Sequence, residues 1–167
     1  NLARGFVQLV LIDAAELVAQ GAEMFTKAPI LDLRITNAGP FVDQICAMPQ
    51  LQGLRSLDMA SGKLGDDGAR AVANCPYLSE LRWLDLKRNE IGADGLEALA
   101  ASANLPSLKR LVFDSNTASD PTPKVASENG MVHAVTISQL GQDLVAKYGH
   151  RAWLADAPAA PPRIDHY

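Results

Sequence analysis

The sequence predicts a right-handed α/β solenoid, with about six short parallel strands on a concave side and helices on the convex side. The main observation is an apolar pattern with a 27-residue period. Its members are Leu54, Leu57, Met59 and Leu64, then Leu81, Leu84, Leu86 and Ile91, then Leu108, Leu111, Phe113 and Ala118. A fixed period of this size indicates repeated units that bury their apolar faces against one another.

Weaker copies of the same strand spacing flank these three. They are Val7, Val10 and Ile12, then Ile30, Leu33 and Ile35, and at the other end Val132, Val135 and Ile137. Outer units of a repeat array must present one face to water, so degenerate copies are expected there. We therefore expect six strand units, of which three are degenerate.

The segments between strands carry a helical stripe with the same period. The stripe positions are Val42, Ile45 and Cys46, then Ala69, Val72 and Ala73, then Leu96, Leu99 and Ala100. This i, i+3, i+4 spacing predicts one apolar face for each helix. We expect further helices at about 14–25 and 139–148, and a loop in place of a helix at 115–130.

These elements predict one repeat domain over residues 1–154. It comprises a degenerate N-terminal unit (1–29), the main repeats (30–116), and then a loop, a last strand and a capping helix (117–154). Residues 155–167, which are rich in Ala and Pro, are expected to form an extended tail.

Bulk properties restrict the function. The chain has 167 residues and a formal net charge of −4, which disfavours nucleic-acid binding because that requires a concentrated basic face. No apolar run has the length of a membrane helix, so a membrane-bound form is not expected. The chain begins with Asn1 and not with Met, so an upstream segment can be missing. Two cysteines do not make a disulfide framework and favour the cytoplasm.

The strand pattern follows the frame L-x-x-L-x-L-x-x-N-x-L, with Asn89 and Asn116 in the asparagine position and Gly62 replacing it once. It resembles leucine-rich repeats, and the segment from Ile91 to Ala100 resembles their ribonuclease-inhibitor-like class. More narrowly, residues 4–154 are similar to bacterial leucine-rich-repeat proteins with a repeat-companion domain, although no helical companion segment is visible. The resemblance implies recognition of another protein and transfers no catalytic residue.

Repeats of this kind align outward-facing residues into columns. The first column reads Asp32, Ser56, Trp83 and Arg110, with Leu9 and Ala134 at its ends, and Trp83 stands at the centre of the face. The next reads Leu11, Arg34, Asp58, Asp85, Val112 and Thr136, and a third includes Lys87 and Asp114. Tryptophan and arginine are enriched in binding hot spots. The predicted partner-binding residues are Trp83, Arg110, Asp85, Asp58, Lys87, Arg34 and Asp114.

Two catalytic alternatives are weighed against this. Asp58 and Asp85 occupy equivalent positions on adjacent strands and could do acid–base work or bind a cation, but Arg34 and Lys87 offset their charge. Cys75 could be a nucleophile if a histidine such as His133 or His150 lay within reach, which the frame does not provide. Cys46 aligns with Ala73 and is expected to be a buried core residue. No zinc spacing and no phosphate-binding glycine loop are present.

The sequence therefore predicts a non-enzymatic module that recognises or scaffolds an unknown protein, without metal or cofactor. Two alternatives stay open. The chain could be the regulatory or substrate-recruiting part of a larger enzyme or multi-domain protein, or an enzyme that uses Asp58/Asp85 or Cys75.

Overall fold

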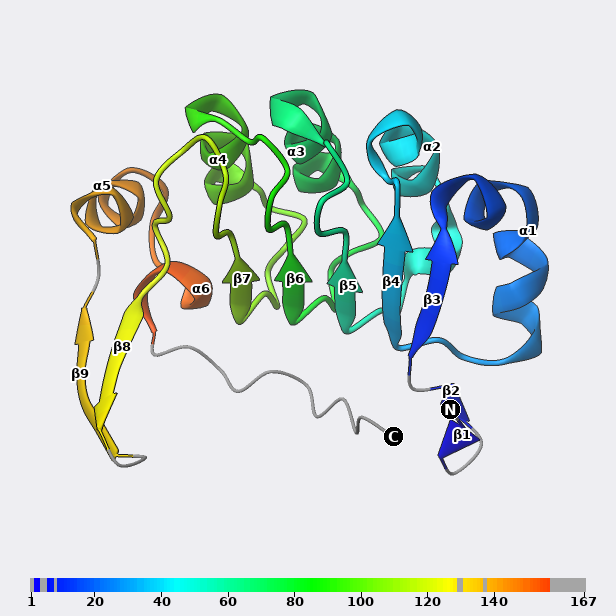
Figure 1. The fold of residues 1–167 in the computed structure, drawn as a ribbon, viewed down its shortest axis with the longest axis horizontal. Helices are drawn as coiled ribbons and strands as arrows, with labels where there is room; N and C mark the ends of the chain where they lie inside the picture. The colour runs from blue at the N-terminus through cyan, green and yellow to red at the C-terminus, as the bar shows by residue number, and fades with distance from the viewer. Residues whose placement is uncertain (1, 4–5, 8, 129–130, 137, 157–167) are drawn as a thin grey trace.

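The computed structural model describes residues 2–3, 6–7, 9–128, 131–136 and 138–156, and the side chains within 9–123 and 138–156. A five-stranded parallel sheet runs through it in chain order (Figure 1). Its strands are β3 (Val10–Asp13), β4 (Asp32–Thr36), β5 (Ser56–Asp58), β6 (Trp83–Asp85) and β7 (Arg110–Val112). Sequence neighbours are thus also spatial neighbours, as a repeat architecture requires.

Helices connect the strands and form a second row beside the sheet (Figure 1). They are α1 (Ala14–Lys27), α2 (Val42–Cys46), α3 (Gly65–Asn74) and α4 (Ala93–Ala101), with short 3-10 helices η1 (Gly39–Phe41) and η2 (Pro49–Leu51) on either side of α2. Each helix in the row packs against the next one. The helical stripes predicted from sequence are buried, including Ala69, Val72 and Ala73 on α3.

The core lies between the two rows. Strands β4 to β7 each send a leucine into it, and these residues, Leu33, Leu57, Leu84 and Leu111, are at most 3% exposed. The residues on either side of them along each strand point to the other face, because side chains alternate in a strand. The 27-residue pattern therefore describes one continuous apolar core, as predicted.

Asparagine side chains tie successive turns together. Asn89 is fully buried, accepts the Gly62 N–H at 2.7 Å and donates to the Met59 carbonyl at 2.9 Å. Asn116 repeats the arrangement one unit later by accepting from Asn89 and donating to the Leu86 carbonyl. Side chains thus satisfy backbone groups that the short strands leave unpaired.

The C-terminal end is covered by α5 (Gln139–Tyr148) and α6 (Ala152–Ala155). Glu97 on α4 accepts hydrogen bonds from Lys147 and Tyr148, and Trp153 and Leu154 are buried. The predicted capping helix at 139–148 is confirmed with its residue bounds.

The predicted sixth parallel strand is wrong. Val132 and Val135 lie in β9 (Met131–Thr136), which pairs antiparallel with β8 (Lys124–Glu128) in a separate two-stranded sheet. Pairing with a strand only a few residues away closes a much shorter loop than a return to β7. The predicted loop at 115–130 is therefore also partly wrong, because β8 occupies its second half. Ile137 lies outside the described residues.

The first strand is shorter than predicted. Val7 belongs to β2 (Phe6–Val7), which pairs antiparallel with β1 (Leu2–Ala3), and the parallel strand begins only at Val10. Consequently Leu9, Ala134 and Thr136 do not extend the columns of the parallel sheet. Within the part of the chain that the structure describes, no helix is long and apolar enough to cross a membrane.

Candidate functional site

The strand register aligns the predicted columns across the sheet. Asp32, Ser56, Trp83 and Arg110 are successive partners, and so are Leu11, Arg34, Asp58, Asp85 and Val112. We call the surface made by these nine residues the polar sheet face. It lies opposite the buried leucines, so the helices do not cover it. Five of the seven predicted site residues, Arg34, Asp58, Trp83, Asp85 and Arg110, belong to it.

The remaining two predicted residues lie just beyond the strand ends. Lys87 is half-buried and follows β6, and Asp114 is exposed and follows β7. The backbones of these two loops are joined, because Arg88 N–H donates to the Asp114 carbonyl at 3.0 Å. The structure therefore places five of the seven predicted residues on one face of the sheet and the other two just beyond the ends of β6 and β7.

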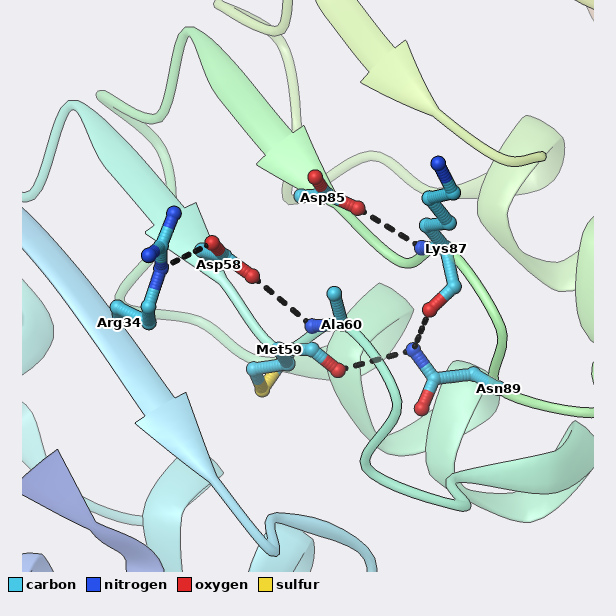
Figure 2. Close-up of polar contacts among 7 residues, drawn as sticks. All are labelled: Arg34, Asp58, Met59, Ala60, Asp85, Lys87 and Asn89. Carbon is cyan, nitrogen blue, oxygen red and sulfur yellow. Dashed lines mark hydrogen bonds and ion pairs between the residues drawn. The ribbon is translucent and has the colours of Figure 1, made fainter. Parts of the chain in front are cut away.

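An ion pair lies near the middle of the polar sheet face. Arg34 Nε donates to Asp58 Oδ2 at 2.5 Å, and the other carboxylate oxygen of Asp58 accepts the Ala60 N–H at 3.0 Å (Figure 2). The Asp58 carboxylate is thus held from both sides. This geometry confirms the prediction that Arg34 offsets the charge of Asp58.

Asp85 differs from its neighbour in the same column. Its carboxylate accepts the Lys87 N–H at 2.9 Å, and among the described residues no cationic side chain forms an ion pair with it (Figure 2). Burial raises the pKa of Asp85 above its ordinary value, and the Asp58 charge adds to the rise, while the Lys87 N–H opposes it. The charges of Lys87 and Arg34 therefore offset the cost of the charged form of Asp85 only in part.

Asp32 shows a weaker form of the same effect. It stands at the start of β4, and burial raises its pKa although the positive charge of Arg55 acts in the opposite direction. Two carboxylates of one face therefore have environments that favour protonation.

Trp83 lies at the centre of the row, on β6 between Ser56 and Arg110. Its side chain is half-buried, but its indole nitrogen is buried. Among the described residues this nitrogen is the one buried side-chain nitrogen or oxygen without a hydrogen-bond partner. Buried tryptophan N–H groups usually have an acceptor, so this donor is unusual.

One feature of the face was missed as a site residue. Leu11 is 64% exposed and stands at the β3 edge of the second column. An apolar residue at an outward position of a strand was the available signal, because outward positions of a solvated strand are normally polar.

The cysteines form a buried pair in the helix layer. Cys75 Sγ donates to the Cys46 carbonyl at 3.3 Å, and the two side chains are 1% and 9% exposed as residues. The adjacent Cys75 thiol and burial together raise the pKa of Cys46. Burial of Cys46 confirms its predicted core position. A nucleophile must reach its substrate, which burial of Cys75 opposes.

The histidines do not complete a catalytic arrangement in the described structure. His150 Nε2 lies 2.9 Å from Asp156 Oδ1, at the C-terminal cap. The side chain of His133 and all of His166 lie outside the described residues. Within that described part, no group of three or more His, Cys, Asp or Glu side chains is arranged to hold a metal ion.

A comparison with protein families supports the repeat assignment. Residues 51–73 and 77–100 each match the family model described as Leucine Rich repeat. Each match begins just before a strand, β5 or β6, and ends in the helix that follows it, α3 or α4. No curated protein matches the chain. The chain therefore carries leucine-rich repeats in its central part, within an α/β fold whose five parallel strands alternate with helices.

Proposed function

We propose that this chain is a non-catalytic recognition module that binds a protein partner through the polar sheet face. Leucine-rich repeats generally mediate protein–protein interaction, which supports the class of function. The five adjacent strands present outward side chains at about 5 Å intervals, a spacing suited to an extended segment or helix of another protein.

The observation that carries the proposal is the combination of Trp83 and Asp85 on β6. Among the described residues, the indole N–H of Trp83 has no acceptor, and no side-chain cation forms an ion pair with Asp85. Both groups are costly to bury alone and gain from a partner that supplies an acceptor and a cation. Such poorly compensated groups on a surface are more typical of binding sites than of structural positions.

The overall form of the array is part of the proposal. The 27-residue repeat contains one strand and one α-helix, which supports a right-handed solenoid of the ribonuclease-inhibitor-like class. The polar sheet face would form the concave side of this solenoid. Two reduced, buried cysteines support a reducing compartment such as the bacterial cytoplasm. The net charge of −4 supports a protein partner over a nucleic acid.

The test compares capture of proteins from native lysate by the wild-type chain and by the double variant Trp83→Ala/Arg110→Ala. Loss of a hot-spot tryptophan costs about 2 kcal/mol or more, so we expect at least a roughly 30-fold weaker capture of specific partners. Arg70→Ala on α3 is the matched control, since Arg70 is exposed on the helix layer. Capture that is equal for the double variant and the control would contradict a site on this face.

A further inference from the structure

Three cationic residues stand in a row at the edge of the sheet where β5, β6 and β7 begin. Arg55, Arg82 and Lys109 each directly precede the first residue of one of these strands. Their backbones are joined in succession, because the Arg82 N–H donates to the Arg55 carbonyl and the Lys109 N–H donates to the Arg82 carbonyl, both at 2.9 Å. We call these three residues the cation row. It lies along the lower edge of the sheet in Figure 1, at the opposite ends of the strands from Lys87 and Asp114.

The cation row has little counter-charge within the described part of the chain. All three residues are exposed, and their side chains form no ion pair or hydrogen bond with another described residue. Burial raises the pKa of Asp32 and the charge of Arg55 opposes this rise, but the two side chains do not pair. Neighbouring strands lie only about 5 Å apart, and like charges side by side on them destabilise a sheet. Three such cations in successive repeats therefore favour a binding role over a structural one.

An apolar hollow lies beside the β4 end of the cation row. Leu31 holds the equivalent place before β4, and its carbonyl accepts the Arg55 N–H at 2.8 Å. Leu31 also lines an open hollow of about 320 Å³, together with Phe25 and Ile30. Gly53, two residues before Arg55, belongs to the same lining. The hollow therefore begins next to the first cation and has room for a large apolar side chain.

These two features specify the chemistry of an occupant. It should present carboxylates at regular intervals and an apolar side chain beyond them. On one face of an α-helix, residues at i, i+4 and i+7 lie about 5–6 Å apart, which is close to the spacing of about 5 Å between strands. A nucleic acid fits less well, because the chain carries a net charge of −4 and the hollow suits an apolar side chain better than a phosphate.

We propose that the cation row binds an acidic helix of a partner protein. Carboxylates on one face of this helix pair with Arg55, Arg82 and Lys109, and a large apolar side chain next to them enters the hollow beside Leu31. The helix crosses the starts of the strands, adjacent to the polar sheet face. The inference rests on the proposed function for the class of partner, but it uses neither residue of the Trp83→Ala/Arg110→Ala test.

The test measures binding of a labelled synthetic peptide to the full chain by fluorescence anisotropy at low salt. The peptide is an alanine-based helix of about 18 residues, with Glu at i, i+4 and i+7 and Phe one turn beyond this row at each end. Arg55→Gln/Arg82→Gln/Lys109→Gln should bind it about tenfold more weakly than the wild type. Lys27→Gln/Lys63→Gln/Arg70→Gln removes the same charge from exposed positions elsewhere, and should stay within about twofold of the wild type.

A second arm tests the hollow. Replacing both Phe residues of the peptide with Ala should weaken its binding to the wild type at least about fivefold, because an apolar side chain then loses its burial. Ala22 is exposed on α1 and lines the hollow, so Ala22→Trp fills it from the surface. This variant should bind the two peptides equally. A preference for the Phe peptide that survives in Ala22→Trp would overturn the assignment of the hollow.

The remaining outcomes identify the occupant. The proposal is overturned if the wild type does not bind the peptide, if both triple variants bind it alike, or if a peptide with Lys in place of Glu binds as tightly. Displacement of the peptide by an equal concentration of a single-stranded oligonucleotide would make a nucleic acid the occupant. Self-association of the wild type that the cation-row variant abolishes would make a second copy the occupant, and either result rejects the proposal.

The double variant Trp83→Ala/Arg110→Ala separates this inference from the proposed function. It should leave peptide binding within about twofold of the wild type, since neither residue belongs to the cation row. Peptide binding that depends on the cation row, with lysate capture unchanged in the double variant, would reject the polar sheet face and keep the cation row. Lost capture in the double variant without peptide binding by the wild type would do the reverse.

Discussion

At the residue scale, Asn89 shows how one side chain replaces several missing backbone contacts. It is fully buried and accepts the Gly62 N–H. It also donates to the carbonyls of Met59 and Lys87, and so joins the turn after β5 to the turn after β6 (Figure 2). Gly62 occupies the equivalent position one repeat earlier and has no side chain to do the same. Asn89 and Asn116 thus each satisfy backbone groups of the preceding unit, whereas Gly62 contributes only its carbonyl, which accepts the Gly39 N–H at 2.8 Å.

Replacing Asn89 with Ala should strongly destabilise the fold. It leaves the Gly62 N–H and the Met59 carbonyl buried without partners, and each such group costs about 1–3 kcal/mol. We expect a loss of about 3 kcal/mol in the free energy of unfolding, measured by urea denaturation. Glu80→Ala, on an exposed turn of the same repeat, should change it by less than about 0.5 kcal/mol. A similar loss in both variants would contradict this role.

The second prediction at this scale concerns pH. Because burial raises the pKa of Asp85 in the folded protein above the unfolded value of about 3.8, the folded state favours the protonated acid. Asp85 therefore lowers stability as the pH rises from 3.8 through the raised pKa. Asp85→Asn imitates the protonated form, so it should be more stable than the wild type at pH 7.

The check is chemical denaturation of Asp85→Asn and the wild type at pH 7 and at pH 3. The difference in the free energy of unfolding should be largest at pH 7. It should disappear below pH 3.8, where both proteins carry a neutral side chain at position 85. Asp67→Asn is the control, because the Asp67 side chain is 95% exposed. Equal stability of Asp85→Asn and the wild type at neutral pH would show that the charged form of Asp85 is not destabilised by burial.

At the element scale, α3 caps the helix of the following repeat. Asp66, in the first turn of α3, accepts the Gly92 N–H at 2.6 Å and the Gly95 N–H at 3.0 Å at the start of α4. The two helices approach closely there, and a Cβ at Gly95 would lie 2.6 Å from the Asp66 carboxylate and 2.9 Å from Ala69. Glycine at 95 is thus required by packing.

The neighbouring carboxylates Asp66 and Asp67 offer a matched test of this cap. Asp66→Ala removes two hydrogen bonds at a helix N-terminus and should cost about 1–2 kcal/mol in the free energy of unfolding. Asp67→Ala removes only an exposed i,i+3 pair with Arg70 and should cost less than about 0.5 kcal/mol. Thermal or urea denaturation distinguishes the two, and equal costs would disprove the cross-repeat cap.

Sequence predicted the regular elements well because they repeat. The stripe of Ala69, Val72 and Ala73 follows from periodicity alone, and so does the partnership of Asp58 with Asp85 across two strands. The cap by Asp66 could not be foreseen, because no equivalent carboxylate exists in the next repeat, where Ala93 stands. The β8–β9 hairpin was missed because the strand spacing of Val132 and Val135 does not say which strand will pair with them.

The candidate site, like the fold, could be predicted from the sequence only in part. The columns followed from the repeat, so positions such as Trp83 and Arg110 could be placed on one face in advance. The differences within a column could not, since burial of Asp85 and the unpaired N–H of Trp83 depend on how neighbouring side chains pack. A periodic sequence defines positions but not their individual environments.

At the scale of the whole molecule, the array depends on the closure of its ends. Each unit contacts mainly its neighbours, so an open end exposes the core. Helices α5 and α6 close the end next to α4, through the hydrogen bonds of Lys147 and Tyr148 to Glu97 and through the buried Trp153. The hairpin of β8 and β9 lies between the last repeat and this cap in the chain.

Truncating the buried part of the cap should therefore destabilise the C-terminal repeats. Trp153→Ala removes a side chain whose residue is 3% exposed, and we expect a loss of about 3–5 kcal/mol. Hydrogen exchange should locate the effect, with backbone amides of α4 and β7 deprotected more than those of β4. A uniform loss of protection along the whole chain would show that the repeats unfold as one cooperative unit.

The central claim is that the polar sheet face binds a partner. The most direct measurement is quantitative capture from native lysate by the wild-type chain, by Trp83→Ala/Arg110→Ala and by the helix-layer control Arg70→Ala. The account predicts proteins retained by the wild type and the control and depleted about 30-fold by the double variant. Equal retention by all three would contradict it.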